Sequence, residues 1–282
     1  MKSSTTATKA AFKSFVYTVC IMLTFLSIFP FWTMIVNATR STYEIQQHAV
    51  SILPSKFLSS NWNILNGKSF NATSGFINSL IISVCATICA VYFSTLTAYS
   101  VVVYDWKLRR AFFTFIMAVM MVPSQIVTIG FYQMIYKIGM TNNFIPLILP
   151  AIAAPSTVFF MRQYMIPSLS LEIIESARID GAREFYTFNM IALPIMKPAI
   201  ATQAIFIFVS KWNELFMPLV LLTKQKFYTM PIMVSLLRGD IYRTEYGSIY
   251  LGLMLTVLPL FVVYFLLSKY IIAGVALGSV KG

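Results

Sequence analysis

Long apolar runs separated by polar segments dominate this chain of 282 residues. Each run is long enough to cross about 30 Å of hydrocarbon as a helix of about 20 residues. Because lipid offers the backbone no hydrogen-bond partner, each run is predicted to be a helix, and the alternation of barrel strands is not seen. The pattern predicts an all-α integral membrane protein with six transmembrane helices. The predicted spans are residues 14–37, 75–103, 111–136, 144–166, 198–223 and 246–272.

Composition agrees with a membrane protein. Hydrophobic residues make up 58% of the chain and charged residues 11%, against about 45–50% and 25% in soluble domains. The net charge of +12 would suit nucleic acid only if it formed a basic face on a soluble scaffold. Here Lys and Arg lie between apolar runs, where they set topology and meet anionic lipid. We therefore expect a lipid bilayer as partner and no nucleic acid.

The beginning of the chain resembles a signal peptide, with Lys2, Lys9 and Lys13 before an apolar stretch. That stretch, residues 14–36, is longer than a signal core of roughly 7–15 residues, so we expect an uncleaved first span. Most of the 21 Lys and Arg residues are cytoplasmic if both termini are. The bias is sharpest in the short turn 104–111.

This topology predicts four parts of the chain. They are a cytoplasmic N-terminus (1–13), a first span with an outer loop (14–73), a core transmembrane domain (74–272) with a cytoplasmic loop at 167–197, and a cytoplasmic tail (273–282). A second long outer segment covers 224–245. Prolines in the third and fourth spans, Pro123 among them, predict kinks that either open a path or only aid packing.

The loop 167–197 is far longer than a connector of about 2–8 residues. Ser170 is a predicted N-cap, Gly181 breaks the apolar run, and Pro194 ends a second helical stretch. We expect a helix–turn–helix on the cytoplasmic surface. Its aromatic residues favour a protein partner over lipid, since lipid-surface helices are usually rich in Lys and Arg.

Candidate catalytic chemistry is sparse. Cys20, Cys85 and Cys89 lie in apolar runs and are expected to be small buried hydrophobes. The single histidine, His48, has no catalytic partner in the pattern, and no metal cluster is apparent. Gly67-Lys68-Ser69 lacks the earlier glycine of a phosphate-binding loop, because Trp62 occupies that position. We therefore expect no enzyme, no metal and no cofactor on this chain.

The loop carries a recognisable signature. Glu175-Ser176-Ala177 is followed after three residues by Gly181 and after nine more by Ile191-Ala192-Leu193-Pro194. This resembles the EAA motif of ABC importer permeases, with Ser176 as its one departure. Trp212-Asn213-Glu214 and the closing residues Gly278, Val280, Lys281 and Gly282 are similar to carbohydrate-uptake permeases, in particular the shorter membrane subunit of maltose-type transporters.

The resemblance implies the type I ABC importer permease fold in the cytoplasmic membrane of a bacterium or archaeon. It implies a second permease subunit, an ATPase dimer that holds ATP and Mg²⁺, and an extracellular solute-binding protein. The loop would then dock on the ATPase and transmit its motion to the next span. The residues expected at that contact are Glu175, Ser176, Ala177, Asp180, Gly181, Phe185, Phe188, Leu193 and Pro194.

Span five contains two opposite charges three residues apart, Lys211 and Glu214. Either alone would cost about 2.5–3.5 kcal/mol at the centre of a bilayer, and this spacing allows them to pair. The pair either lines the translocation path or orients the helix. The family resemblance adds Trp212, Asn213 and Glu214 to the expected path. It does not extend to Lys211.

The predicted function is import of a carbohydrate, an oligosaccharide or related polyol, by an ATP-driven permease subunit. Two alternatives stay open: an ABC importer of a non-sugar solute, and a secondary transporter coupled to an ion gradient through Lys211 and Glu214.

Overall fold

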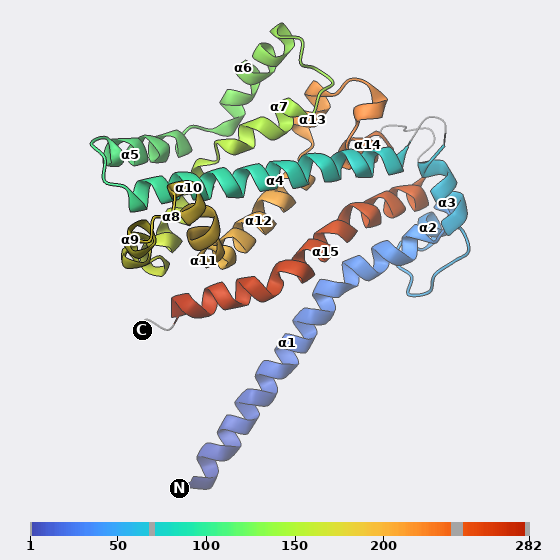
Figure 1. Ribbon diagram of the computed structural model, residues 1–282. Helices are drawn as coiled ribbons and strands as arrows, with labels where there is room; N and C mark the ends of the chain where they lie inside the picture. The colour runs from blue at the N-terminus through green and yellow to red at the C-terminus, as the bar shows by residue number, and fades with distance from the viewer. Residues whose placement is uncertain (1, 68–70, 238–244, 280–282) are drawn as a thin grey trace. The chain divides into compact units, whose positions relative to one another are not determined.

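The computed structural model describes the backbone of residues 2–67, 71–237 and 245–279, and side chains within 12–67, 71–123, 126–236 and 245–268. All regular elements in these ranges are helices (Figure 1). Lys68, Ser69 and the closing residues Val280, Lys281 and Gly282 lie outside the described residues. The chain forms two compact units, one of Met1–Ala72 with Val234–Val257 and one of Thr73–Met233 with Leu258–Gly282.

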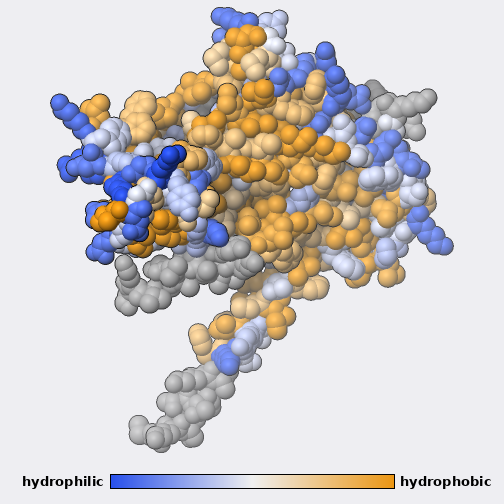
Figure 2. Space-filling view, viewed as in Figure 1, coloured by the Kyte–Doolittle hydropathy of each residue, from blue (hydrophilic) through white to orange (hydrophobic). Residues whose placement is uncertain are grey.

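Four helices are long and apolar enough to cross a membrane: Phe12–Ala38, Ala72–Val103, Ile145–Ser168 and Tyr246–Ser268. They match the first, second, fourth and sixth predicted runs. Two further helices, Glu184–Ile195 and Lys197–Trp212, meet at an angle of 79° and are together long and apolar enough to cross a membrane. Apolar residues cover most of the visible surface (Figure 2), as expected of a surface that faces lipid.

The prediction that each run is a single helix is wrong for the third and fifth runs, whereas the kink predicted at Pro123 is confirmed. Residues 111–136 are divided into α5 (Arg109–Met120) and α6 (Ser124–Lys137), and Figure 1 shows α6 turning away from α5. Pro123 has no N–H to donate to the helix, so the break lies just before it. Residues 198–223 are divided into α12 (Lys197–Trp212) and α13 (Phe216–Leu221).

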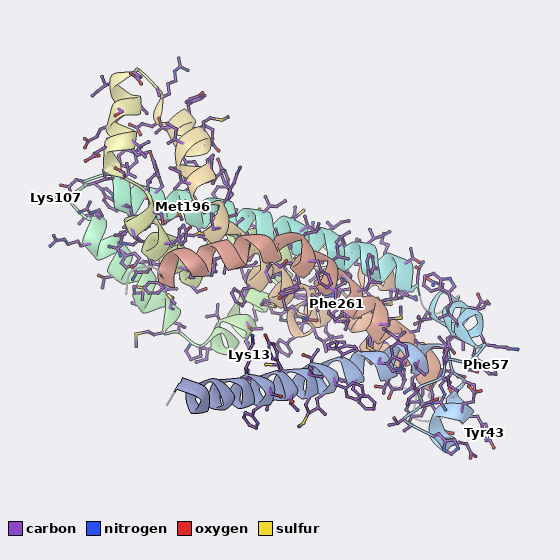
Figure 3. The ribbon with its side chains drawn as sticks, turned by 90° about the horizontal axis from the view of Figure 1, so that it is seen from below. Lys13, Tyr43, Phe57, Lys107, Met196 and Phe261 are labelled. Carbon is purple, nitrogen blue, oxygen red and sulfur yellow. The ribbon has the colours of Figure 1, made fainter. Side chains whose placement is uncertain are left out.

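The first unit consists of α1 (Lys2–Ala38), the short helices α2 (Thr42–Gln47) and α3 (Leu58–Leu65), and the first part of α15 (Tyr246–Ser279). Side chains stand out along α1 from Lys13 onward (Figure 3), and most of them are apolar and exposed.

A polar network closes the segment after α1. The Arg40 guanidinium is buried and donates to the Asn37 side chain and to the carbonyls of Glu44 and His48. Asn61 donates to the carbonyls of Ala38 and Arg40 at 2.9 Å each. A reciprocal capping box between Ser41 and Glu44 begins α2.

The second unit is built along α4 (Ala72–Val103). Its other elements are α5, α6, α7 (Ile145–Ile148), η1 (Leu149–Ile152), α8 (Pro155–Ser168), α9 (Leu171–Ile179), α10 (Glu184–Thr187), η2 (Phe188–Ala192), α11 (Leu193–Ile195), α12, α13 and η3 (Gln225–Phe227). Helix α14 (Met230–Leu237) and α15 contribute residues to both units. Helix η2 is a π-helix, a feature often found at functional sites.

Candidate functional site

The predicted helix–turn–helix at 167–197 is present as α9, a turn, and α10 continuing through η2 into α11. Ser170 occupies the N-cap position of α9, although its side chain makes no capping bond. At the other end, Ala182 N–H donates to Ala177 O and Gly181 N–H donates to Arg178 O. These bonds form a Schellman motif, which needs a left-handed residue, and Gly181 has φ +79°. The predicted turn at Gly181 is confirmed.

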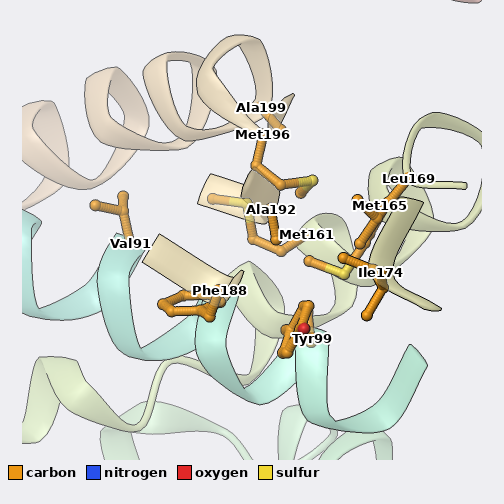
Figure 4. Close-up of a cluster of buried hydrophobic side chains, with 11 residues drawn as sticks. Val91, Tyr99, Met161, Met165, Leu169, Ile174, Phe188, Ala192, Met196 and Ala199 are labelled. Atoms are coloured by element: carbon orange, nitrogen blue, oxygen red, sulfur yellow. The ribbon is translucent and has the colours of Figure 1, made fainter. Parts of the chain in front are cut away.

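One side of this loop is buried against α4 and α8. Ile174, Phe188, Ala192 and Met196, here termed the buried root, belong to one apolar cluster (Figure 4). The Phe188 ring lies 5.3 Å from the ring of Tyr99 on α4. Because burial of such side chains contributes about 1.5–3 kcal/mol each, the root holds the loop firmly to the second unit.

A polar clasp adds a second attachment. The Arg178 side chain donates to Glu184 at 2.7 Å, and the Tyr104 hydroxyl donates to the same carboxylate at 2.5 Å. The hydrogen bond from Arg178, followed by that from Tyr104, lowers the pKa of the Glu184 carboxyl. Burial, followed by the bond to Glu184, raises the pKa of Tyr104 to about 12. The clasp joins the end of α4 to both helices of the loop.

The opposite side of the loop is open. Phe185 is 68% exposed and Ile179 is 86% exposed, and Tyr186 and Met190 are exposed beside them. We refer to these four residues as the exposed tip. Large apolar side chains gathered on a polar segment are typical of a protein-binding surface. The sequence prediction included only Phe185. The sequence signal that could have identified Ile179 is its position at the end of a helix, directly before Asp180-Gly181.

The other predicted contact residues divide between the two sides. Glu175, Ser176, Asp180, Gly181 and Pro194 are exposed, and Ala177 is buried. Leu193 is half-buried. The Ser176 hydroxyl donates to the carbonyl of Glu172, within its own helix.

Two features of this loop differ from the prediction. Phe188 is 1% exposed, so its ring stabilises the root and offers no surface to a partner. Pro194 does not end the second helical stretch, because it lies inside the continuous stretch Glu184–Ile195. The 79° bend follows at Met196, and α12 begins with Pro198 in its first turn.

A cavity of about 730 Å³ forms where three helices are interrupted, and we refer to it as the large cavity. Val122 lines it from the α5–α6 break, Ala153 from the break between η1 and α8, and Glu214 from the α12–α13 break. In membrane proteins, irregular backbone is tolerated where it lines such a cavity. The wall of this cavity is largely apolar, and its polar lining residues are Thr128, Ser156, Lys211 and Glu214.

Lys211 and Glu214 both line this cavity, and their charged groups pair at 2.8 Å. Their side chains are 28% and 30% exposed. Asn213 is exposed and donates to the carbonyl of Val209, at the end of its own helix. Trp212 differs from the path prediction: it is 1% exposed and stacks on Phe208 at 5.7 Å. The indole packs in the protein interior and does not line the cavity.

Within the described residues, no group of three or more His, Cys, Asp and Glu side chains is placed to hold a metal ion. Cys20 is exposed on α1, and Cys85 and Cys89 are half-buried on α4, so the expectation that all three are buried is wrong. The placement of ATP and Mg²⁺ on a partner chain stays a prediction.

Comparisons with known proteins agree with this architecture. A family model described as "Binding-protein-dependent transport system inner membrane component" matches residues 90–276. The arabinooligosaccharides transport system permease protein AraQ of Halalkalibacterium halodurans is 32% identical over 92% of this chain and 93% of the relative. The lactose transport system permease protein LacG of Rhizobium radiobacter is 30% identical over 94% and 95%.

The solved structures supply a fold match. A chain of a bacterial ABC transporter involved in the import of the acidic polysaccharide alginate superimposes with a TM-score of 0.81. The match covers 94% of this chain and 98% of the other at 20% sequence identity. It shows that the chain has an ABC importer permease fold.

Proposed function

Because the chain belongs to the family of inner membrane components of binding-protein-dependent transport systems, we propose that it moves a carbohydrate across the cytoplasmic membrane of a bacterium or archaeon. Family membership makes it a multi-pass membrane protein and a transport subunit. The sugars in the names of both relatives support an oligosaccharide or related polyol as the solute.

The proposed topology has six spans with both termini in the cytoplasm. The α5–α6 pair would form one broken span, and α12 with α13 another. The turn between α4 and α5, which contains Lys107, Arg109 and Arg110, would be cytoplasmic together with the loop 167–197. The hydrogen bond between Tyr104 and Glu184 supports this, since it joins that turn to the loop.

The proposed assembly contains this chain, a second permease subunit, an ATPase dimer and an extracellular solute-binding protein. The single observation that carries it is an exposed tip on a buried root. Such a loop offers apolar anchors to an ATPase while it stays fixed to α4, α8 and α12. A push on the tip would reach α12 through the bend at Met196. ATP and Mg²⁺ would be bound by the partner, and ATP binding would favour one state through differential contacts.

Reconstituted transport tests this proposal. The complete transporter in liposomes should take up labelled oligosaccharide only with ATP inside. Phe185→Glu should reduce co-purification of the ATPase and uptake by about tenfold or more, because it buries a charge at the contact. Leu53→Glu, an equally exposed apolar position in the first unit, is the control and should leave co-purification unchanged. Normal assembly and uptake with Phe185→Glu would contradict docking through the tip.

The large cavity is the proposed translocation path, with Lys211 and Glu214 at its wall. Lys211→Met or Glu214→Gln leaves one charge unpaired, and we expect uptake to fall about tenfold. The double exchange Lys211→Glu with Glu214→Lys keeps the pair but moves each charge. Full uptake by the double exchange would mean that the pair only orients α12. Uptake abolished by an uncoupler while ATP is present would instead favour an ion-coupled transporter.

A further inference from the structure

A second cavity, of about 600 Å³, lies where the end of α4, the beginning of α5, and the junction of α8 and α9 come together. We refer to it as the basic cavity. Three guanidinium groups line it, those of Arg109, Arg110 and Arg162. No acidic residue is among its lining residues. Figure 3 labels Lys107, which lies in the adjoining turn.

Within the protein, the positive charges that line this cavity have few acidic partners or hydrogen-bond acceptors. In the part of the chain that the structure describes, the one salt bridge of these arginines joins Arg109 to Asp105 at 3.5 Å, and Asp105 is almost fully exposed. Arg162 lies over the ring of Phe113 at 4.3 Å, and its Nε atom is buried without a hydrogen-bond partner. A buried donor left unpaired costs about 1–3 kcal/mol. Arg109 also donates to the carbonyl of Tyr104 at 3.2 Å, so the acceptor that is missing is the one for the Arg162 Nε–H.

The residues that line the cavity and its position at the end of α4 indicate which kind of acceptor would fit it. Guanidinium groups bind phosphate oxygens through paired hydrogen bonds. The remaining wall is largely aliphatic, with Val101, Ile166 and Leu169 among its residues. A free anion would use the arginines and leave this apolar wall in contact with water, whereas an amphiphile would cover both. The cavity also lies where the apolar run of α4 ends, which is the level of lipid headgroups.

We propose that the basic cavity binds the phosphodiester headgroup of an anionic phospholipid such as phosphatidylglycerol. Arg110 and Arg162 hold the phosphate, and Val101, Ile166 and Leu169 contact the glycerol and the upper acyl chain. Leu169 also belongs to the apolar cluster beneath the loop 167–197. A bound lipid therefore braces the beginning of α9. This inference goes beyond solute transport and does not depend on which solute is carried.

Native mass spectrometry of the full chain and of the complete transporter tests the proposal. Each is titrated with phosphatidylglycerol, with phosphatidylcholine, or with millimolar inorganic phosphate. We expect adducts that prefer phosphatidylglycerol. Arg110→Gln with Arg162→Gln should weaken them by about thirtyfold, at about 1 kcal/mol for each charge removed. Arg110→Gln alone, at an exposed position, should weaken them about fivefold and guards against misfolding of the double variant.

The control is Lys137→Gln with Lys224→Gln, which removes two exposed charges away from this cavity. Equal lipid binding by the control and by the double arginine variant would overturn the proposal. So would full competition by inorganic phosphate, which would identify a soluble anion as the ligand. Adducts on the full chain that disappear in the complete transporter would assign the cavity to an acidic side chain of a partner, and would also overturn it.

Discussion

Two polar segments of this chain, which lie outside its apolar runs, are stabilised by different kinds of contact. The segment after α1 turns inward, since Arg40 and Asn61 use their side chains to bind carbonyls of the same segment. The loop 167–197 buries its root but leaves Phe185 and Ile179 exposed. A segment whose polar groups are satisfied internally supports its own shape. The first segment also exposes apolar side chains, Ile52 and Leu53 among them, but those of the loop stand on helices that are fixed by the buried root and by the clasp at Glu184.

The largest expected effect tests whether the first segment supports itself. Arg40→Ala removes three hydrogen bonds of a buried guanidinium, and of their acceptors the carbonyl of Glu44 keeps its bond from the His48 N–H. Because hydrogen bonds to a charged group contribute about 1.5–3 kcal/mol each, we expect a loss of about 3–5 kcal/mol in the free energy of unfolding, measured as a lower thermal midpoint of the purified chain. Lys56→Ala, an exposed charge of the same segment, should stay within about 0.5 kcal/mol. Similar midpoints for both variants would show that the network contributes little.

Some features of the loop 167–197 could be predicted from the sequence and others could not. The turn at Gly181 could be predicted because a glycine between two short helical patterns has a backbone reason that is local. Whether Phe188 faces a partner or the interior could not, because that depends on Tyr99, far away in the chain. Likewise, no local pattern shows that Trp212 stacks on Phe208 instead of lining a path.

The spans show the same limit. Apolar runs located the helices correctly where they are continuous, as in α1 and α4. Pro123 marked a possible interruption, but a proline in a membrane helix can kink it or end it, depending on what satisfies the freed carbonyls. The break between α12 and α13 was not predicted. The large cavity joins residues from three such breaks. It therefore follows from packing of distant segments, which hydrophobicity alone does not encode.

The next largest expected effect tests whether the turn at Gly181 in the loop 167–197 serves coupling to ATP or only folding. Gly181 has φ +79° and Gly139 has φ +70°, and an added Cβ would meet nothing within 4 Å at either position. Valine at each should therefore cost a similar amount, about 1–2 kcal/mol, from left-handed backbone alone. We expect Gly181→Val to lower ATP-driven uptake strongly and Gly139→Val to leave most of it, with similar thermal midpoints. Equal uptake would mean that the turn has no special part in coupling.

The smallest effect concerns the clasp that joins the two helices of the loop to α4. Glu184 is exposed and its folded pKa is lowered from 4.5, first by Arg178 and then by Tyr104. Its ionised form therefore adds stability above about pH 4.5, and this contribution disappears as the pH falls through the lowered pKa. Glu184→Gln should be slightly less stable than the parent chain at pH 7, by less than about 1 kcal/mol, and the difference should vanish in acid. Tyr104→Phe removes only the neutral donor and should show a weaker pH dependence.

The difference in the free energy of unfolding between Glu184→Gln and the parent chain could instead stay constant from pH 7 to pH 3. The carboxylate would then not be the group that closes the clasp, and the attachment of the loop would rest on the buried root around Phe188 alone.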